Sequence, residues 1–204
     1  TYQDVTDTTV TAQFQTIKET LPANLQAEDD LYILAWTTTP WTIPANRAIS
    51  LHPELSYELV EVQLESGSEQ YVLAADLVDA SMKRYGIEDY RVLASFTGAA
   101  LENLRVNHPL NPITVPLILG EHVTTESGTG CVHTAPAHGV DDFNVGKKYG
   151  IEVYNPVGSN GVYLDNTPLF AGQHVFKAND NIIAALEEQN ALALNVKYEH
   201  SYPH

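Results

Sequence analysis

The distribution of apolar residues along the chain predicts short strands more often than helices. Residues 10–15 alternate apolar and polar side chains with a period of two, which is typical of a strand buried on one face. Residues 31–36 are apolar without interruption and predict a strand buried on both faces. Residues 57–64 and 70–73 flank a polar turn that contains Gly67, and this arrangement predicts a β-hairpin. Further strands are expected over residues 91–96, 114–119, 131–134 and 192–196.

Three segments carry helical signals instead. Helices are expected over residues 76–85 and 141–149, because a glycine, the usual helix-ending residue, follows each of them. A third helix is expected over residues 179–189, with Asn179 or Asp180 as its N-cap. Many short strands and few helices, without a regular alternation of the two, predict an α+β fold with a mostly antiparallel, barrel-like sheet.

Length and composition suit one packed domain. The chain has 204 residues, of which 44% are hydrophobic and 18% charged, so a core is feasible and wholesale disorder is not expected. The chain starts without methionine, and neither end resembles a natural terminus. We therefore expect residues 1–204 to be a single domain excised from a larger protein, with residues 1–30 and 197–204 as edge or linker segments. Residues 22–30 within the first of these are polar and rich in turn-forming residues.

Charge and cysteine content restrict the partners and the compartment. Ten Lys and Arg against 26 Asp and Glu give a formal charge of −16. Because binding to a long phosphate backbone depends on many Lys and Arg contacts, the chain is not expected to bind one by itself. A single nucleotide end in a pocket remains compatible with this charge. Cys131 is the only cysteine, which fits a reducing cytoplasm. No stretch approaches the roughly 20 apolar residues of a membrane span, and no signal segment is visible, so no membrane is expected.

Residues 36–47 form the first candidate for chemistry, with the sequence Trp-Thr-Thr-Thr-Pro-Trp-Thr-Ile-Pro-Ala-Asn-Arg. The two prolines prevent continuous strand or helix hydrogen bonding, so the preceding strand is expected to end near Thr38. A rigid loop with free hydroxyl and backbone groups would then bind a polar ligand between apolar walls made by Trp36 and Trp41. The alternative is that β-branched threonines merely favour strand ends and that both rings belong to the core.

Residues 124–143 form the second candidate. A glycine-rich turn leads into a short strand, and a helix is expected to start near Asp141. Asp142 would lie in the first turn of this helix, where the dipole and the free N–H groups favour an ionised carboxylate. Such a fixed anion at the edge of a pocket is suited to a ligand ammonium group. The alternative is that Asp141 and Asp142 only cap the helix.

Other chemistry in this segment has weaker support. Cys131, His133 and His138 lack the spacing of common zinc motifs, and Ser127 does not lie in a G-x-S-x-G elbow. Cys131 and His133 would lie side by side on a strand without the third group that orients a catalytic pair, so Cys131 is expected in the core. The remaining histidines are expected at the surface: His52, His108, His122, His174, His200 and His204.

Two segments together carry a resemblance that neither carries alone. Residues 36–48 extend the threonine-rich sequence above, and residues 128–142 read Gly-Thr-Gly-Cys-Val-His-Thr-Ala-Pro-Ala-His-Gly-Val-Asp-Asp. This combination resembles the editing domain of isoleucyl-tRNA synthetase, the insertion in the class I catalytic domain called connective polypeptide 1. Residues 154–158, 175–180 and 200–204 are similar to this family as well, so the resemblance covers most of the chain from about residue 31.

Details of the sequence refine the resemblance. Valyl and leucyl relatives usually carry arginine where this chain has Thr39, which favours the isoleucyl branch. The catalytic signatures HIGH and KMSKS are absent, so this chain is not expected to make aminoacyl-adenylate. Ala137 stands where some isoleucyl members have glycine, a departure that affects only the conformation of this loop.

The resemblance implies a role for each matching residue. Asp142 matches the aspartate that binds the α-ammonium group, and His133 matches the residue that helps to exclude isoleucine. Asn46 matches a position that is important for editing, residues 37–39 match the threonine row that lines the pocket, and residues 128–130 bring the backbone close to the ligand. The expected catalytic residues are Asp142, Thr38 and Thr39, and the expected substrate-binding residues are Thr37, Trp36, Trp41, Asn46, Gly128, Thr129, Gly130, His133, His138 and Asp141.

The family hydrolyses valine that has been wrongly esterified to the isoleucine tRNA. Valine lacks one methylene of isoleucine, a difference worth only ~1–3 kcal/mol in a binding pocket, and isoleucyl-tRNA synthetase is itself the standard example of this limit. A second, smaller pocket that admits valine and excludes isoleucine corrects the error. Because the sequence offers no convincing Ser–His or Cys–His pair, we expect a positioned water to attack the ester, with valyl-adenylate as a second substrate.

The resemblance also implies the partners. They are the aminoacylated 3′ end of the isoleucine tRNA, valine or valyl-adenylate, and the rest of the synthetase chain, with no metal or other cofactor in this domain. Two alternatives stay open, namely a non-catalytic module that binds amino acids or aminoacyl ends, and a free-standing deacylase that edits in trans.

Overall fold

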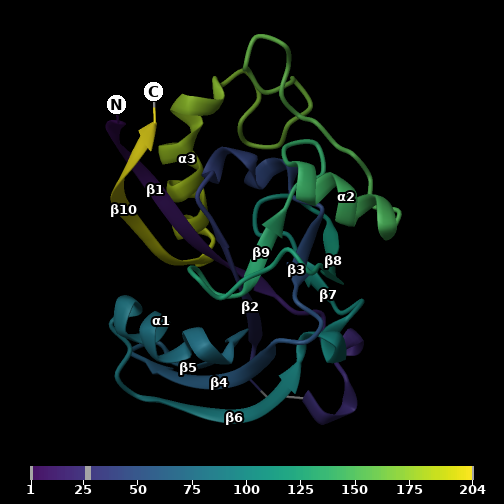
Figure 1. Ribbon diagram of the computed structural model, residues 1–204, viewed down its shortest axis with the longest axis vertical. Helices are drawn as coiled ribbons and strands as arrows, with labels where there is room; N and C mark the ends of the chain where they lie inside the picture. Colours follow the sequence, from purple (N-terminus) through teal and green to yellow (C-terminus); the bar gives the residue numbers. More distant parts are fainter. Residues whose placement is uncertain (1, 26–28, 204) are drawn as a thin grey trace.

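A curled sheet of ten strands organises the molecule, as the computed structural model in Figure 1 shows. The structure describes residues 2–25 and 29–203. The strands are β1 (Tyr2–Gln15), β2 (Leu31–Thr37), β3 (Ala48–Leu51), β4 (Ser56–Leu64), β5 (Gly67–Ala74), β6 (Tyr90–Thr97), β7 (Arg105–Asn107), β8 (Thr114–Leu119), β9 (Cys131–Thr134) and β10 (Leu192–Pro203). The α-helices are α1 (Val78–Tyr85), α2 (Val140–Lys148) and α3 (Val175–Glu188), and short 3₁₀ turns include η3 (Pro40–Ala45).

The strand order makes the sheet curl. Neighbouring strands follow the order β6-β4-β5-β2-β9-β3-β8-β7, and β1 pairs with both β2 and β10. An isolated bridge between Thr16 and Val106 then joins the end of β1 to β7 at the far edge, so the strands from β1 to β7 nearly close on themselves. Six of the nine pairs between described strands are antiparallel. The predicted α+β class with a mostly antiparallel, barrel-like sheet is confirmed.

The first and last strands lie together. β1 and β10 form an antiparallel pair that runs from Tyr2 opposite Pro203 to Ala12 opposite Leu192, and both labelled ends of the chain lie beside each other in Figure 1. Thr1, residues 26–28 and His204 lie outside the described residues, and so does part of the turn-rich segment expected over residues 22–30. The assignment of residues 1–30 and 197–204 as edge or linker segments stays a prediction.

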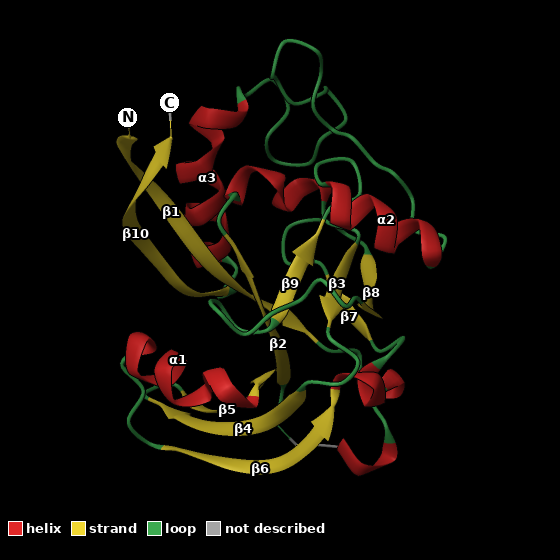
Figure 2. Ribbon diagram, in the orientation of Figure 1, coloured by secondary structure: helices red, strands yellow, loops and turns green. Residues whose placement is uncertain are grey.

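Each helix covers one part of the sheet (Figure 2). α1 packs on β4 and β5 through Val78 and Met82. α2 packs on β3 and β8 through Val145, and α3 contributes Ile182 and Leu186 to the main core between the curled sheet and η3. The three helices thus pack against different parts of the sheet.

All eight predicted strands are found, five of them within one residue at both ends. β1 begins eight residues before the predicted start, β5 begins three residues before it, and β10 ends seven residues after the predicted end. The uninterrupted apolar run becomes β2, in which Ile33 packs in the main core and Leu34 packs in the cluster under α1. β2 is thus buried on both faces, as expected. β3 and β7, which have only four and three residues, were not predicted from the sequence.

The helix predictions require two corrections. α1 begins at Val78, after a 3₁₀ turn over Ala75–Leu77, and ends at Gly86 in the left-handed conformation. α3 begins at Val175, four residues before the predicted start, so Asn179 and Asp180 are not its N-cap. The His174 side chain caps this helix instead, because its Nδ1 accepts a hydrogen bond from the Phe176 N–H at 3.3 Å.

Candidate functional site

The threonine row lies where β2 ends. The strand stops at Thr37, close to the predicted end, and Thr39 precedes η3. The expectation of an irregular loop is wrong in part, because residues 40–45 form a 3₁₀ helix. Pro40 occupies its first position, where a missing N–H costs nothing. The Thr39 N–H donates to Thr37 Oγ1 at 3.0 Å, and the hydroxyl oxygens of Thr38 and Thr39 lie 3.5 Å apart.

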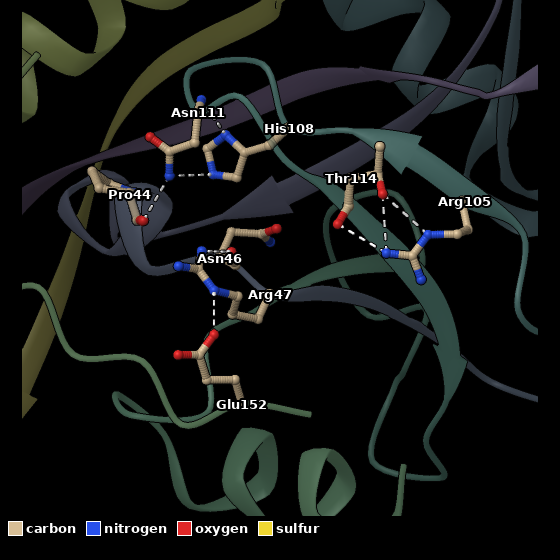
Figure 3. Close-up of polar contacts among 8 residues, drawn as sticks. All are labelled: Pro44, Asn46, Arg47, Arg105, His108, Asn111, Thr114 and Glu152. Carbon is tan, nitrogen blue, oxygen red and sulfur yellow. Dashed lines mark hydrogen bonds and ion pairs between the residues drawn. The ribbon is translucent and has the colours of Figure 1, made fainter. Parts of the chain in front are cut away.

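Side chains from distant segments fix the end of η3 (Figure 3). His108 Nε2 lies 2.9 Å from the Ile43 carbonyl oxygen, and the Asn111 amide donates to the Pro44 carbonyl at 3.0 Å. Arg47 donates to the carbonyl of Asn46 at 2.8 Å and pairs with Glu152 at 3.7 Å. These contacts satisfy carbonyls that a short helix leaves open, and they hold Asn46 fully buried.

Asn46 starts a chain of buried hydrogen bonds that passes through His133. The Asn46 amide nitrogen lies 2.7 Å from His133 Nδ1 and can only donate, so Nδ1 accepts. The proton of the neutral imidazole therefore lies on Nε2, which donates to Thr42 Oγ1 at 2.8 Å. The Thr42 hydroxyl donates onward to the Thr39 carbonyl at 2.8 Å. This Asn46–His133–Thr42 chain ties the β9 histidine to the threonine row.

The His133 imidazole is held neutral. Its residue is only 7% exposed, and burial lowers the pKa of His133 to about 3, with His108 and His138 lowering it further. Since both ring nitrogens are already used within the protein, His133 presents carbon atoms to its surroundings rather than a free acid or base. The side chain is suited to shaping a wall and not to moving protons.

Asp142 lies at the start of α2, as predicted. α2 begins at Val140, and Asp142 Oδ2 accepts a hydrogen bond from the Ala135 N–H at 2.9 Å. Burial raises the pKa of this carboxyl, whereas the Ala135 N–H and the nearby His122 lower it. An ionised carboxylate that is partly shielded from water is stabilised by a cationic partner. Asp141, by contrast, is exposed on the first turn.

A cavity of about 220 Å³ lies between the ends of β2 and β9. The two strands run parallel, with Trp36 opposite Val132, so their carboxyl ends meet at one edge of the sheet. The loop before β9 closes this edge. Its Gly128 has φ +77°, and a Cβ there would lie 2.7 Å from the Trp36 ring, so only glycine allows this approach. The lining residues are Trp36, Thr37, Thr38, His122, Val123, Thr124, Ser127, Thr129, Gly130, Cys131, Val132 and His133.

The structure gathers about half of the predicted residues around this cavity. Six of them line it: Trp36, Thr37, Thr38, Thr129, Gly130 and His133. Thr39 and Asn46 adjoin the lining through the hydrogen bonds described above. Thr129 is fully buried, and its hydroxyl donates to the Leu34 carbonyl at 2.6 Å. Thr129 therefore fastens the loop to β2.

Trp41 and His138 form a separate contact. Their rings meet edge to face at a centroid distance of 5.2 Å, and neither residue belongs to the cavity lining. Burial lowers the pKa of His138, and the neighbouring Asp142 raises it. Asp142 does not belong to the cavity lining either. Whether Trp41, His138, Asp141 and Asp142 contact a ligand stays a prediction.

One histidine contradicts the surface prediction. His108 is 5% exposed, with Nδ1 accepting from the N–H groups of Leu110 and Asn111. The His108 side chain is buried by segments far away in the sequence, so its polar neighbours in the chain were misleading. His122 lines the cavity and is partly exposed. His52 and His174 are partly exposed, and the predictions for His200 and His204 lie outside the described side chains.

The weaker alternatives gain no support. Cys131 is fully buried in the core, as expected, and burial raises the pKa of its thiol. Its Sγ faces the Val72 carbonyl at 3.9 Å. Within residues 2–25 and 29–203, no group of three or more His, Cys, Asp or Glu side chains is placed to hold a metal ion. The same described ranges contain no helix with the length and apolar character that a bilayer crossing requires.

Comparison with known sequences identifies the class of domain. The family model described as "Leucyl-tRNA synthetase, editing domain" matches residues 24–192. The isoleucine–tRNA ligase of Pseudoalteromonas atlantica (strain T6c / ATCC BAA-1087) is 61% identical over 194 residues, which are 95% of this chain and 20% of that protein. That of Shewanella sp. (strain MR-4) is 54% identical over 207 residues, which are 100% of this chain and 22% of that protein. The chain thus spans about a fifth of the length of these curated relatives.

Solved structures share the fold. The crystal structure of GlLeuRS-CP1 aligns with a TM-score of 0.72 at 17% identity and covers 92% of this chain and 98% of that one. The P. knowlesi cytosolic leucyl-tRNA synthetase editing domain aligns with a TM-score of 0.70 at 9% identity, covering 96% and 97%. At these identities the likeness establishes the fold alone.

Proposed function

Because the chain belongs to the synthetase editing-domain family described for leucyl-tRNA synthetase, and its high-identity relatives are isoleucine–tRNA ligases, we propose that it removes valine from mischarged isoleucine tRNA. The reaction is hydrolysis of the ester between valine and the terminal ribose. Valyl-adenylate is a second substrate of the same cavity. The partners are the aminoacylated 3′ end of the tRNA and the remainder of a cytoplasmic synthetase chain.

The observation that carries this proposal is the small cavity closed by an imidazole wall. Its volume of about 220 Å³ falls below the roughly 300–1,000 Å³ of pockets for drug-sized ligands, which suits an aminoacyl group with its ester. His133 is locked by Asn46 and Thr42, so the wall cannot retreat without breaking buried hydrogen bonds. A wall of this kind supports admission of valine and a steric clash with the extra methylene of isoleucine.

Asp142 supplies the charge for orientation. The α-ammonium group of the ligand pairs with a carboxylate that is already partly desolvated and is fixed through Ala135. A positioned ammonium group places the ester carbonyl next to the threonine row. Fixing the reacting groups in this manner lowers the entropic part of the barrier.

The threonine row supplies the hydroxyls. Thr37 Oγ1 already accepts from the Thr39 N–H, and no described residue accepts its proton, so Thr37 can donate to a ligand oxygen. Thr38 and Thr39, with oxygens 3.5 Å apart, can hold one water between them. That water adds to the ester carbonyl carbon, the carbonyl oxygen becomes an oxyanion stabilised by donors, and the carbon–oxygen bond to the ribose breaks. The proton lost by the water ends on the ribose oxygen, which leaves as a hydroxyl.

The geometry favours water over a protein nucleophile. Cys131 is fully buried with a raised thiol pKa, and the ring nitrogens of His133 are both engaged. Neither residue can therefore provide the activated pair that covalent catalysis requires.

Replacement of Asp142 tests the proposal. In a synthetase that carries this domain, Asp142→Asn is expected to abolish deacylation of valyl-tRNA while aminoacylation with isoleucine continues, because the amide keeps the shape and loses the charge. Asp165→Asn, the same change at an exposed loop position, is the matched control. Full deacylation by the Asp142 variant would refute the role of the carboxylate. Binding of valyl-tRNA by the wild type without any hydrolysis would instead identify a non-catalytic module.

A further inference from the structure

His122 is a polar side chain of the cavity that the proposed reaction leaves unused. It lies in the loop between β8 and β9 and belongs to the cavity lining together with Thr37 and Thr38. Its Nε2 is buried, and no described residue forms a hydrogen bond with it. Buried polar atoms in folded proteins nearly always have a partner, so this nitrogen requires an explanation.

The two imidazoles of the cavity differ in what they can offer a ligand. Both ring nitrogens of His133 are hydrogen-bonded within the protein, to Asn46 and to Thr42. His122 lines the same cavity with an unused ring nitrogen. His122 is therefore the imidazole in this lining with a ring nitrogen that no described residue uses. Because Nε2 has almost no accessible surface, the ring must turn before this nitrogen can form a hydrogen bond with an incoming group.

Gly120 makes room for this ring. A Cβ at residue 120 would lie 2.5 Å from His122 Cε1 and 2.6 Å from His122 Nδ1, closer than real contacts allow. The Gly120 backbone lies outside the left-handed region, so backbone conformation does not call for glycine here. The absence of a side chain at residue 120 therefore makes room for the imidazole, and a larger residue there would displace the ring.

His122 is also a neighbour of Asp142, which does not itself belong to the cavity lining. The imidazole is close enough to lower the pKa of the Asp142 carboxyl. A ligand whose ammonium group pairs with Asp142 would therefore lie near His122.

We propose that His122 is a ligand-binding residue of this cavity, whose ring turns when the ligand enters so that Nε2 forms a hydrogen bond with the free hydroxyl of the terminal ribose. The inference rests on the proposed function, because it takes the aminoacylated adenosine as ligand. A hydroxyl both donates and accepts, so it pairs with Nε2 in either neutral tautomer, whereas an ester carbonyl would require a proton on Nε2.

The test is a pair of analogues in which valine is joined to the 3′ position of adenosine through an amide, one with the 2′ hydroxyl and one without it. Affinities are measured by calorimetry on the 204-residue chain. The wild type is expected to bind the hydroxylated analogue about tenfold more tightly, the size of one well-formed hydrogen bond. His122→Phe is expected to bind both analogues equally, and His122→Gln, which keeps a polar group near the Nε2 position, is expected to retain part of the preference.

Two further variants separate contact from folding. Gly120→Ala, which crowds the ring without removing it, is expected to reduce the preference for the hydroxylated analogue. Glu121→Gln alters the exposed neighbour on the same loop and is expected to change neither affinity. Unchanged circular dichroism of each variant establishes that the chain is folded.

The outcomes distinguish this inference from the proposed function. A tenfold preference that persists in His122→Phe would overturn the assignment of His122, and deacylation of valyl-tRNA by the wild type would then still support the function. A preference that depends on His122, in a wild-type protein that hydrolyses nothing, would support the binding role and overturn the proposed hydrolysis. Equal binding of both analogues by the wild type would overturn the inference outright.

Discussion

Thr42→Val is the change that best tests the hydrogen-bond chain from Asn46 to the threonine row. Valine nearly matches threonine in shape, so the substitution removes the hydroxyl without opening a cavity. Two hydrogen bonds of 2.8 Å disappear, one to His133 Nε2 and one to the Thr39 carbonyl. The Thr42 residue is 7% exposed, so water cannot easily replace the lost partner.

The magnitude follows from burial. A net hydrogen bond contributes about 1 kcal/mol, and a buried donor left without a partner costs about 1–3 kcal/mol. We therefore expect Thr42→Val to lower the free energy of unfolding by roughly 2–4 kcal/mol, equivalent to several degrees in Tm for a domain of this size, at about 2–4 °C per kcal/mol. Thr42→Ser keeps the hydroxyl and is expected to lose much less.

Urea unfolding followed by tryptophan fluorescence measures this difference, because Trp41 lies in η3 beside Thr42. The second readout is discrimination. With the His133 wall released, deacylation of correctly charged isoleucyl-tRNA is expected to rise relative to valyl-tRNA. If Thr42→Val unfolds within 0.5 kcal/mol of the wild type, roughly the scatter of surface substitutions, and keeps full discrimination, the hydrogen-bond chain is not what holds the wall.

Two further predictions concern pH and the loop before β9. Burial lowers the pKa of His108 to about 4 and that of His133 to about 3. Below the ordinary pKa near 6.5, the unfolded chain therefore binds protons at these two imidazoles that the folded chain does not bind. The free energy of unfolding is expected to fall as pH falls from about 6.5 toward 4, by up to about 1.4 kcal/mol per pH unit for each imidazole. NMR titration checks this, and midpoints above pH 6 for both rings would contradict it. Tyr57→Phe removes a hydroxyl that donates to the Gly130 carbonyl at 2.6 Å and accepts from the His52 N–H at 2.9 Å. It is expected to cost about 1–3 kcal/mol of stability and to raise KM for valyl-tRNA, and unchanged values of both would show that this contact does not hold the loop.

Local signals in the sequence determined most of the framework. The apolar run of β2 and the hairpin of β4 and β5 depend on residues close together in the chain, and so do the glycine-terminated helices. The motif segments around residues 36–47 and 128–142 likewise indicated the family. In each case the physical preference of a few neighbouring residues is strong enough to be read directly.

Only the tertiary structure decided which side chains meet. Asn46 and Thr42 bond to His133 across 87 and 91 residues, and no pattern in the sequence reports such a contact. His108 stands among polar neighbours, yet distant segments bury its side chain. Periodicity and capping describe how a segment folds, whereas burial, tautomer and the shape of a cavity depend on what packs against it, and this is set by the curl of the sheet as a whole.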